Sequence, residues 1–181
     1  EMCIRDSGCK VNQYESASIM EEMNRLGWES VSKHSPVDLC IINTCTVTQK
    51  ASMQSRQAIR QAIKSNPDAV IIVTGCYAQV ASEEIGAIAG VDYIIGHYKK
   101  PQVAMMADGL KHCDSPMVDV QDIKRHFPFQ DMPVSHFAGR TRPFLKIQDG
   151  CNAFCSYCIV PFARGRSRSF PPGILLERIK E

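Results

Sequence analysis

Short apolar runs bounded by polar turns predict three strands within the first 113 residues. The runs at 38–43 and 69–74 are rich in β-branched residues and contain few polar positions. Such runs are typical of strands that are buried on both faces of a parallel sheet. Residues 92–95 predict a shorter strand of the same kind, which ends at Gly96.

Apolar positions three or four residues apart predict helices between these strands. The first helix is expected over 13–26, where Asn12 with Glu15 forms a candidate N-terminal cap and Gly27 a stop. The other helices are expected over 48–65, 78–89 and 101–109. Strands that alternate with helices indicate βαβ units. The expected fold is therefore α/β, with a mainly parallel open sheet and flanking helices of the Rossmann or flavodoxin type.

The pattern changes at residues 114–138, where Pro116, Pro128 and Pro133 would interrupt any helix. We expect this stretch to be a linker between a first domain at 1–113 and a second domain that begins at 139. The second domain opens with an apolar strand at 144–148. Near the end of the chain, Pro171 and Pro172 predict the start of a helix that runs to Glu181.

Basic residues are concentrated in the second domain, although the net charge of +2 says little about partners. Between positions 139 and 168 the sequence contains one acidic residue, Asp149, and six basic residues, which are Arg140, Arg142, Lys146, Arg164, Arg166 and Arg168. This excess suits an anionic partner such as RNA or the carboxylate of a cofactor, and the alternative is a solvated basic face. The sequence contains no apolar run of the roughly 18 residues that cross a membrane, so we expect a cytoplasmic protein without a membrane partner.

Nine cysteines are many for a chain of this length, and three of them form the motif Cys151-x-x-x-Cys155-x-x-Cys158. In a reducing compartment such spacing indicates metal ligation rather than disulfides. Structural zinc requires four ligands, and the nearest other Cys or His is His136. A 4Fe–4S cluster held by three cysteines instead keeps one iron open for a further ligand. We therefore favour a catalytic cluster over structural zinc.

Three further cysteines follow strands or positions where strands are expected to end. Cys45 follows the strand at 38–43, Cys76 follows the strand at 69–74, and Cys9 precedes the first helix. The carboxyl ends of parallel strands share one edge of the sheet, where ligands bind. The sequence therefore predicts that these three thiols converge on a second site, although small residues also occur in such turns by chance. The remaining Cys3, Cys40 and Cys113, and the five scattered histidines, are interpreted as structural.

Four motifs of this chain are similar to those of the radical S-adenosylmethionine (SAM) methylthiotransferase family. The first three resemble its N-terminal domain: Gly8-Cys9-Lys10-Val11-Asn12-Gln13-Tyr14-Glu15, Asn43-Thr44-Cys45-Thr46-Val47-Thr48 and Thr74-Gly75-Cys76-Tyr77-Ala78-Gln79. The fourth resembles its radical SAM motif and runs from Leu145 through Cys158 to Ser169. The resemblance implies that 1–113 is the methylthiotransferase N-terminal domain. It also implies that 139–181 is the truncated start of a radical SAM partial β/α barrel.

By this resemblance Cys151, Cys155 and Cys158 would hold the radical SAM 4Fe–4S cluster, whose open iron binds SAM. Cys9, Cys45 and Cys76 would hold an auxiliary 4Fe–4S cluster that carries sulfur. Tyr157 would lie near the SAM adenine or simply pack, and Arg164, Arg166 and Arg168 would contact SAM or substrate phosphate or form a solvated loop. In such an enzyme the cofactors would carry out the radical chemistry, and the protein would bind and orient them. The implied partners are the anticodon stem-loop of tRNA, an electron donor such as flavodoxin or ferredoxin, and a sulfur donor.

The run Gly-Cys-Lys-Val-Asn-Gln most resembles the branch that adds a methylthio group to C2 of N6-threonylcarbamoyladenosine in tRNA. Two alternatives remain open. The enzyme could act on isopentenyladenosine in tRNA or on a ribosomal protein aspartate, or the chain could be a non-catalytic metal-binding module. The sequence departs from the family at residues 1–7, which are mixed rather than apolar and would make a poor central strand. The barrel is incomplete as well, so we expect the 181-residue chain to be inactive alone.

Overall fold

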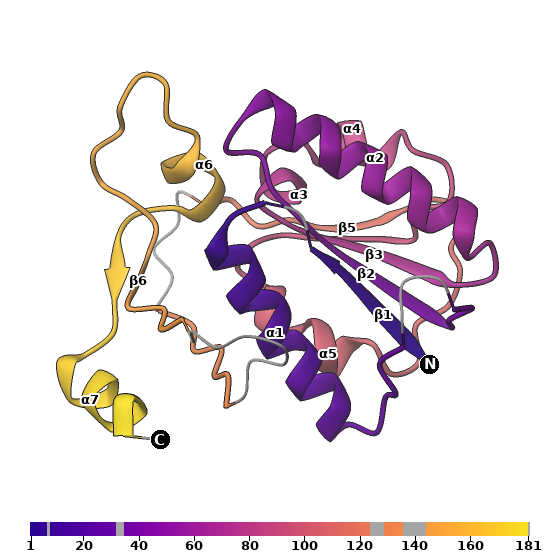
Figure 1. The fold of residues 1–181 in the computed structure, drawn as a ribbon. Helices are drawn as coiled ribbons and strands as arrows, with labels where there is room; N and C mark the ends of the chain where they lie inside the picture. The colour runs from indigo at the N-terminus through magenta and orange to yellow at the C-terminus, as the bar shows by residue number, and fades with distance from the viewer. Residues whose placement is uncertain (7, 32–34, 124–128, 136–143, 181) are drawn as a thin grey trace.

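The computed structural model describes residues 1–6, 8–31, 35–123, 129–135 and 144–180. Its centre is a five-stranded sheet in which every neighbouring pair of strands is parallel, in the order β1-β2-β3-β4-β5 (Figure 1). The strands are β1 (Met2–Asp6), β2 (Leu39–Thr44), β3 (Val70–Gly75), β4 (Tyr93–Ile95) and β5 (Met117–Asp119). The predicted α/β fold with a parallel sheet is confirmed.

Helices cover both faces of the sheet. The helices α1 (Lys10–Arg25) and α5 (Val103–Met106) lie on one face, and α2 (Gln49–Ser65), α3 (Cys76–Val80) and α4 (Ser82–Gly86) lie on the other (Figure 1). Side chains alternate along each strand, so that Ile41 packs in the first core and Ile42 in the second. This burial on both faces explains why the strands read as continuous apolar runs.

The mixed segment at the start of the chain forms β1 at the edge of the sheet. It pairs with β2, in a register that sets Met2 beside Leu39 and Asp6 beside Asn43. Met2, Cys3 and Ile4 are buried and supply both cores, while Asp6 is exposed. The mixed composition of residues 1–7 argued against a central strand. It is compatible with β1, because an edge strand pairs with a single strand of the sheet.

Three helices differ from their predicted bounds. Helix α1 begins at Lys10 instead of residue 13, and its N-cap is Cys9 rather than Asn12. The helix predicted over 78–89 is divided at Ala81, whose φ of −140° and ψ of 42° leave the helical region and separate α3 from α4. The helix predicted over 101–109 is a 3-10 turn, η1 (Lys100–Gln102), followed by the short α5. Helix α2 was predicted correctly, and it is capped by Thr48, whose side chain accepts a hydrogen bond from the backbone of Ala51.

The later part of the chain contains less regular structure than the sequence predicted. The strand expected at 144–148 is reduced to β6 (Gln148–Asp149), which pairs antiparallel with β7 (Arg168–Ser169). Leu145 and Ile147 are exposed, so the burial that a full strand would need is absent from this segment. The helix α6 (Val160–Arg164) was not predicted, whereas α7 (Pro172–Lys180) was.

The stretch predicted to be a linker contributes β5 to the main sheet, where it pairs with β4. Its residues 124–128 and 136–138, together with Arg140 and Arg142 of the basic stretch, lie outside the described residues. Within the described ranges, no helix is both long and apolar enough to cross a membrane.

Candidate functional site

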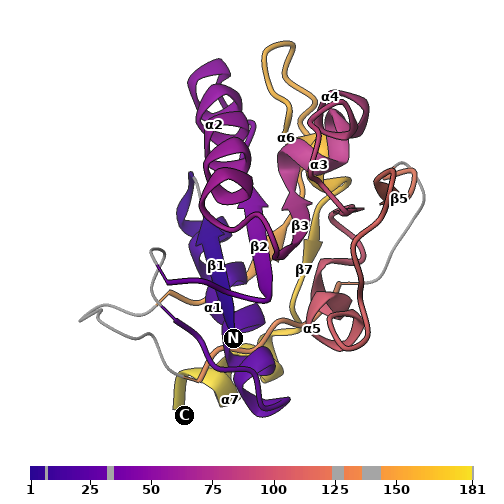
Figure 2. The ribbon, with the colours of Figure 1, turned by 90° about the vertical axis from the view of Figure 1, so that its right-hand side faces the viewer.

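Cys9, Cys45 and Cys76 lie at one end of the sheet, as the sequence predicted. Cys9 is the N-cap of α1 just after β1, Cys45 directly follows β2, and Cys76 is the first residue of α3 after β3. These three strands are parallel neighbours, and their carboxyl ends point towards the end of the molecule where α3 and α6 lie (Figure 2). All three thiols are free; Cys45 and Cys76 are buried and Cys9 is half-buried.

The sulfur atoms of this first triad interact. A hydrogen bond from the Cys45 thiol lowers the pKa of Cys9 to about 5 and raises the pKa of Cys45. Burial raises the pKa of Cys76, and the charge of Arg164 opposes that rise. One sulfur of the triad is thus already a thiolate at neutral pH, which is the form that binds a metal.

Backbone packing fixes the positions of Cys9 and Cys45. Gly8 has a φ of +113°, and a Cβ added to it would lie 2.4 Å from Cβ and 2.6 Å from Sγ of Cys45. Ser55 of α2 accepts a hydrogen bond from the Cys45 amide at 3.1 Å and donates one to the Cys45 carbonyl at 2.9 Å. Only a glycine leaves room for the Cys45 side chain against the turn that carries Cys9.

Two buried asparagines tie α1 to the end of β2. The side-chain amide of Asn12 donates to the carbonyl of Thr44 at 2.8 Å, and that of Asn43 donates to the carbonyl of Asn12 at 3.0 Å. Asn12, predicted as part of a helix cap, therefore has a different role. It holds the first turn of α1, and with it Cys9, against the strand that leads to Cys45.

The second triad lies on the loop between β6 and α6. Cys155 is exposed, and Cys151 and Cys158 are half-buried. The amide of Cys151 donates to the carbonyl of Gly165 at 3.1 Å, and that of Cys158 donates to the carbonyl of Cys155 at 2.9 Å. These bonds curl the loop, which projects from the outer side of the molecule (Figure 1).

The other residues predicted for the second site differ in their surroundings. Tyr157 is 88% exposed, and Arg166 is exposed with its guanidinium 5.5 Å from the centre of the Phe154 ring. Arg168 donates to the carbonyl of Arg164 at 2.6 Å. Arg164 itself is buried and points into the molecule rather than towards solvent.

Glu15 is the centre of a buried ionic network that the sequence did not reveal. This carboxylate on α1 is inaccessible to solvent and accepts hydrogen bonds from three cations. The bonds come from Lys100 at 2.6 Å, from Lys146 at 2.9 Å and from Arg164 at 2.8 and 3.2 Å. The donors belong to three separate segments, so Glu15 joins the α/β unit to the loop of the second triad.

Asp149 is the second carboxylate of the network. It lies 2.9 Å from Nη1 of Arg164, 3.0 Å from Nζ of Lys146 and 2.8 Å from Nε2 of His97. Burial by itself would raise the pKa of both carboxyl groups. The neighbouring cations outweigh burial at Glu15, and the interaction with His97, followed by Arg164 and Lys146, outweighs it at Asp149, so both pKa values lie below their ordinary range. Burial lowers the pKa of His97 to about 4, against the attraction of Asp149, so the imidazole is neutral at neutral pH.

The ligand atoms of Glu15, His97 and Asp149 lie within 4.8 Å of one another, and in the part of the chain that the structure describes this is the one group of that kind. The lysines and the arginine already occupy both carboxylates, so this group is an ion-pair hub and not a metal site. Neither cysteine triad reaches the same spacing. A single ion would require it, whereas each thiolate of a 4Fe–4S cluster binds a different iron.

Of the three cysteines interpreted as structural, Cys3 and Cys40 are buried and Cys113 is not. Cys40 is completely buried within β2, and its sulfur lies 3.2 Å from that of Cys3 on β1. Cys113 is half-buried, and its thiol lies 3.5 Å from the carbonyl of Lys111.

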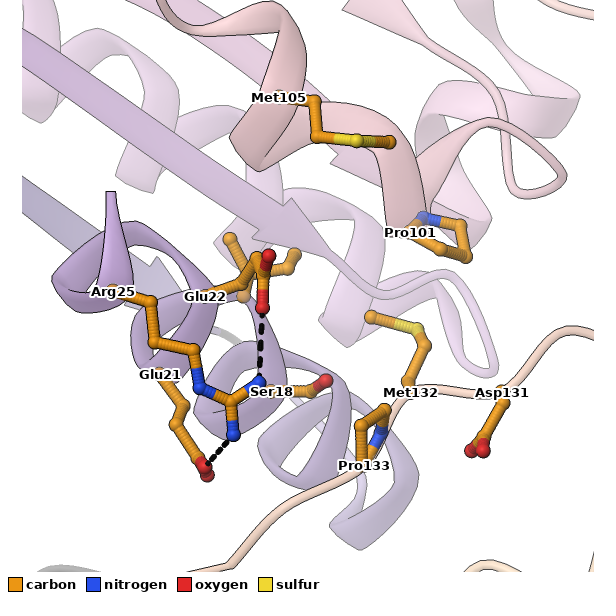
Figure 3. A pocket seen from close by; sticks show the side chains of 10 residues that line it. Ser18, Glu21, Glu22, Arg25, Pro101, Met105, Asp131, Met132 and Pro133 are labelled. Carbon is orange, nitrogen blue, oxygen red and sulfur yellow. Dashed lines mark hydrogen bonds and ion pairs between the residues drawn. The ribbon is translucent and has the colours of Figure 1, made fainter.

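A cavity of about 150 Å³ lies between α1 and α5, away from both triads (Figure 3). Residues Asp131–Pro133 close one side of it, and Arg25 binds Glu21 and Glu22 at its rim. Among the described residues, no cysteine or histidine lines this cavity. Two of its carboxylates, Glu21 and Glu22, are already paired with Arg25.

His97 should make stability depend on pH. Its pKa is about 4 in the folded protein and about 6.5 in an unfolded chain, so the unfolded state takes up a proton first as the pH falls. The contribution of His97 to stability is complete above pH 6.5 and declines towards pH 4. At about 1.4 kcal/mol per pH unit, we expect this contribution to fall by about 2 kcal/mol between pH 7 and pH 5. Cys9, with its lowered pKa, adds a loss of its own over the same range. Urea unfolding at both pH values should therefore show a loss that is about 2 kcal/mol smaller in His97→Gln than in the unchanged chain, and an equal loss in both would disprove the assignment.

Known proteins are similar to this chain in sequence, and their names concern the modification of tRNA. A family model described as "Uncharacterized protein family UPF0004" matches residues 1–96, which contain the first triad. A threonylcarbamoyladenosine tRNA methylthiotransferase of Bacillus subtilis is 41% identical over 174 residues, which are 96% of this chain and 39% of that protein. The protein of the same name from Aquifex aeolicus is 35% identical over 173 residues, 96% of this chain and 42% of its own length.

A second group of similar proteins has a different printed name. A tRNA-2-methylthio-N(6)-dimethylallyladenosine synthase of Ehrlichia canis is 33% identical over 178 residues, which are 92% of this chain and 38% of that protein. The chain spans about two fifths of the length of the relatives that it matches.

Proposed function

Because the chain belongs to the UPF0004 family, we propose that it is the N-terminal part of a tRNA methylthiotransferase that uses radical SAM chemistry. The observation that carries this proposal is the meeting of Cys9, Cys45 and Cys76 at the carboxyl end of three parallel strands. The relatives described above are named as enzymes that modify tRNA, and they are similar over nearly the whole of this chain. We extend their activity to the protein from which this chain comes, not to the 181 residues alone.

The residues of the first triad suit an iron–sulfur cluster. The donor set consists of thiols, one of which is a thiolate at neutral pH, and thiolates are the ordinary ligands of such clusters. Cys9, Cys45 and Cys76 would hold one cluster, and Cys151, Cys155 and Cys158 the other. With clusters and SAM bound, the two sites supply sulfur transfer and radical chemistry.

The chain's own residues would bind and orient the reactants. The exposed triad loop leaves Tyr157 and Arg166 free to contact SAM, while the buried Arg164 positions the loop against α1. The wider protein would take the anticodon stem-loop of tRNA as its substrate, with a separate electron donor and sulfur donor, in the cytoplasm. The sequence predicted domains at 1–113 and 139–181 with a linker at 114–138. Because β5 pairs with β4 in the main sheet, we propose that the first domain extends at least to residue 119.

The substrate branch we favour is N6-threonylcarbamoyladenosine, since the relatives from Bacillus subtilis and Aquifex aeolicus with that name are 41% and 35% identical. The alternative in the same class is dimethylallyladenosine, for which the relative from Ehrlichia canis, 33% identical, is named. Nucleoside mass spectrometry of tRNA from cells with and without the complete gene separates the two. Loss of the methylthio group from threonylcarbamoyladenosine supports the proposal, and its persistence contradicts it.

Iron and acid-labile sulfide after anaerobic reconstitution of the chain test the two sites directly. We expect about eight irons per chain, four for each cluster. Replacing Cys151, Cys155 and Cys158 by alanine should leave about four, and the same change at Cys9, Cys45 and Cys76 should also leave about four. Cys113→Ala is the matched control and should retain about eight. Zinc without iron would overturn the proposal in favour of a non-catalytic metal-binding module.

A further inference from the structure

We infer that Arg164 is a positioning residue that links the second cysteine loop to the first thiol triad and raises the reduction potential of the cluster held there. The inference rests on the proposed function, because it requires a cluster at Cys9, Cys45 and Cys76. It goes beyond that function because it gives Arg164, which lies at the end of α6 directly after the second loop, an effect on the cluster of the first triad.

Arg164 reaches the first triad through a shared contact. Its Nη2 lies 3.1 Å from the side-chain oxygen of Asn12, and the sulfur of Cys9 lies 3.8 Å from the same oxygen. Arg164 is also the last residue of α6, which contacts α3, the helix that begins at Cys76. Arg164 thus shares the Asn12 oxygen with the Cys9 thiol, and its charge acts on both Cys9 and Cys76.

The ionic network carries an excess of positive charge towards these thiols. Lys100, Lys146, Arg164 and Arg168 contribute four positive charges, while Glu15 and Asp149 contribute two negative charges, which leaves an excess of two positive charges in a largely buried region. An arginine cannot lose its proton in a protein, so this charge is permanent. Electrostatic interactions are stronger in such a poorly solvated site than in water.

A cluster held by three thiolates is anionic and becomes more negative when it accepts an electron. A fixed positive charge nearby stabilises the reduced form more than the oxidised form. The net charge around a cluster and the hydrogen bonds to its ligands are established determinants of its potential. Because Arg164 ends α6, the helix that directly follows the second loop, correct docking of that loop and helix would be a condition for the normal potential of the first cluster.

The test uses the chain with Cys151, Cys155 and Cys158 replaced by alanine, so that only the first cluster is reconstituted. Its midpoint potential is measured by a redox titration followed by electron paramagnetic resonance. Arg164→Gln should make reduction at least tenfold less favourable, which is about 59 mV for a one-electron couple. Arg164→Lys keeps the charge and should change the equilibrium by less than about threefold. Asp149→Asn removes a negative charge from the same network and should shift the potential in the opposite direction.

Opposite shifts for Arg164→Gln and Asp149→Asn support the inference, because a purely structural role would move both variants in the same direction or leave both potentials unchanged. The inference would be overturned if the midpoint potentials of Arg164→Gln and Asp149→Asn shifted in the same direction. It would also be overturned if Arg164→Gln changed the reduction equilibrium by less than about twofold. If Arg164→Gln fails to fold, the sign of the shift in Asp149→Asn and the retained potential of Arg164→Lys decide the matter. A parent chain without about four irons would instead contradict the proposed function itself.

Discussion

Replacing Glu15 by glutamine is expected to lower the free energy of unfolding by about 3–5 kcal/mol, the usual cost of removing one partner from a buried ion pair. Glu15 is completely buried and accepts hydrogen bonds from Lys100, Lys146 and Arg164. Without its charge these three cations face Asp149 alone, and they are too buried to be stabilised by water instead. Urea unfolding monitored by circular dichroism measures the loss.

Glu22→Gln is the matched control, since it makes the same chemical change on the same helix. The Glu22 side chain is 41% exposed and pairs with Arg25 at 3.2 Å. A solvated pair of this kind on a helix surface contributes little, so we expect a change within about 0.5 kcal/mol. If Glu15→Gln also costs less than 1 kcal/mol, the network does not hold the two parts of the chain together as described.

The sequence was sufficient to predict the first triad but not this network. Cys9, Cys45 and Cys76 could be placed together because each follows a strand, and the carboxyl ends of parallel strands share one edge. Glu15 has no comparable local signal: its position three residues after Asn12 matched the pattern of a helix cap, and its true partners lie 85 to 149 residues away. An ion pair between distant segments depends on packing that no short pattern encodes.

Two wrong predictions of secondary structure also arose because contacts between distant segments cannot be seen in a short stretch of sequence. The helix predicted over 78–89 is divided at Ala81, whose φ of −140° and ψ of 42° lie outside the helical region. The apolar run at 144–148 has strand composition, but only Gln148 and Asp149 find a pairing partner, in β7. Local propensity is overridden in both places by the tertiary contacts available to the segment.

The mutation Gly8→Ala should remove one of the two clusters. Gly8 has a φ of +113°, and an added Cβ would lie 2.6 Å from the sulfur and 2.4 Å from Cβ of Cys45. The methyl group must displace Cys45 or the turn that carries Cys9, and either movement separates two ligands of the same cluster. We expect iron after reconstitution to fall from about eight to about four per chain.

Gly109→Ala separates this steric effect from backbone strain. Gly109 also has a positive φ, +83°, but an added Cβ there would find no atom within 4 Å. Both variants therefore incur the cost of a left-handed residue, about 1–2 kcal/mol, whereas only Gly8→Ala disturbs a cysteine. Gly109→Ala should retain about eight irons. Full iron in Gly8→Ala would mean that Cys45 can leave its observed position and still bind, and the contact with Gly8 would then have no part in building the site.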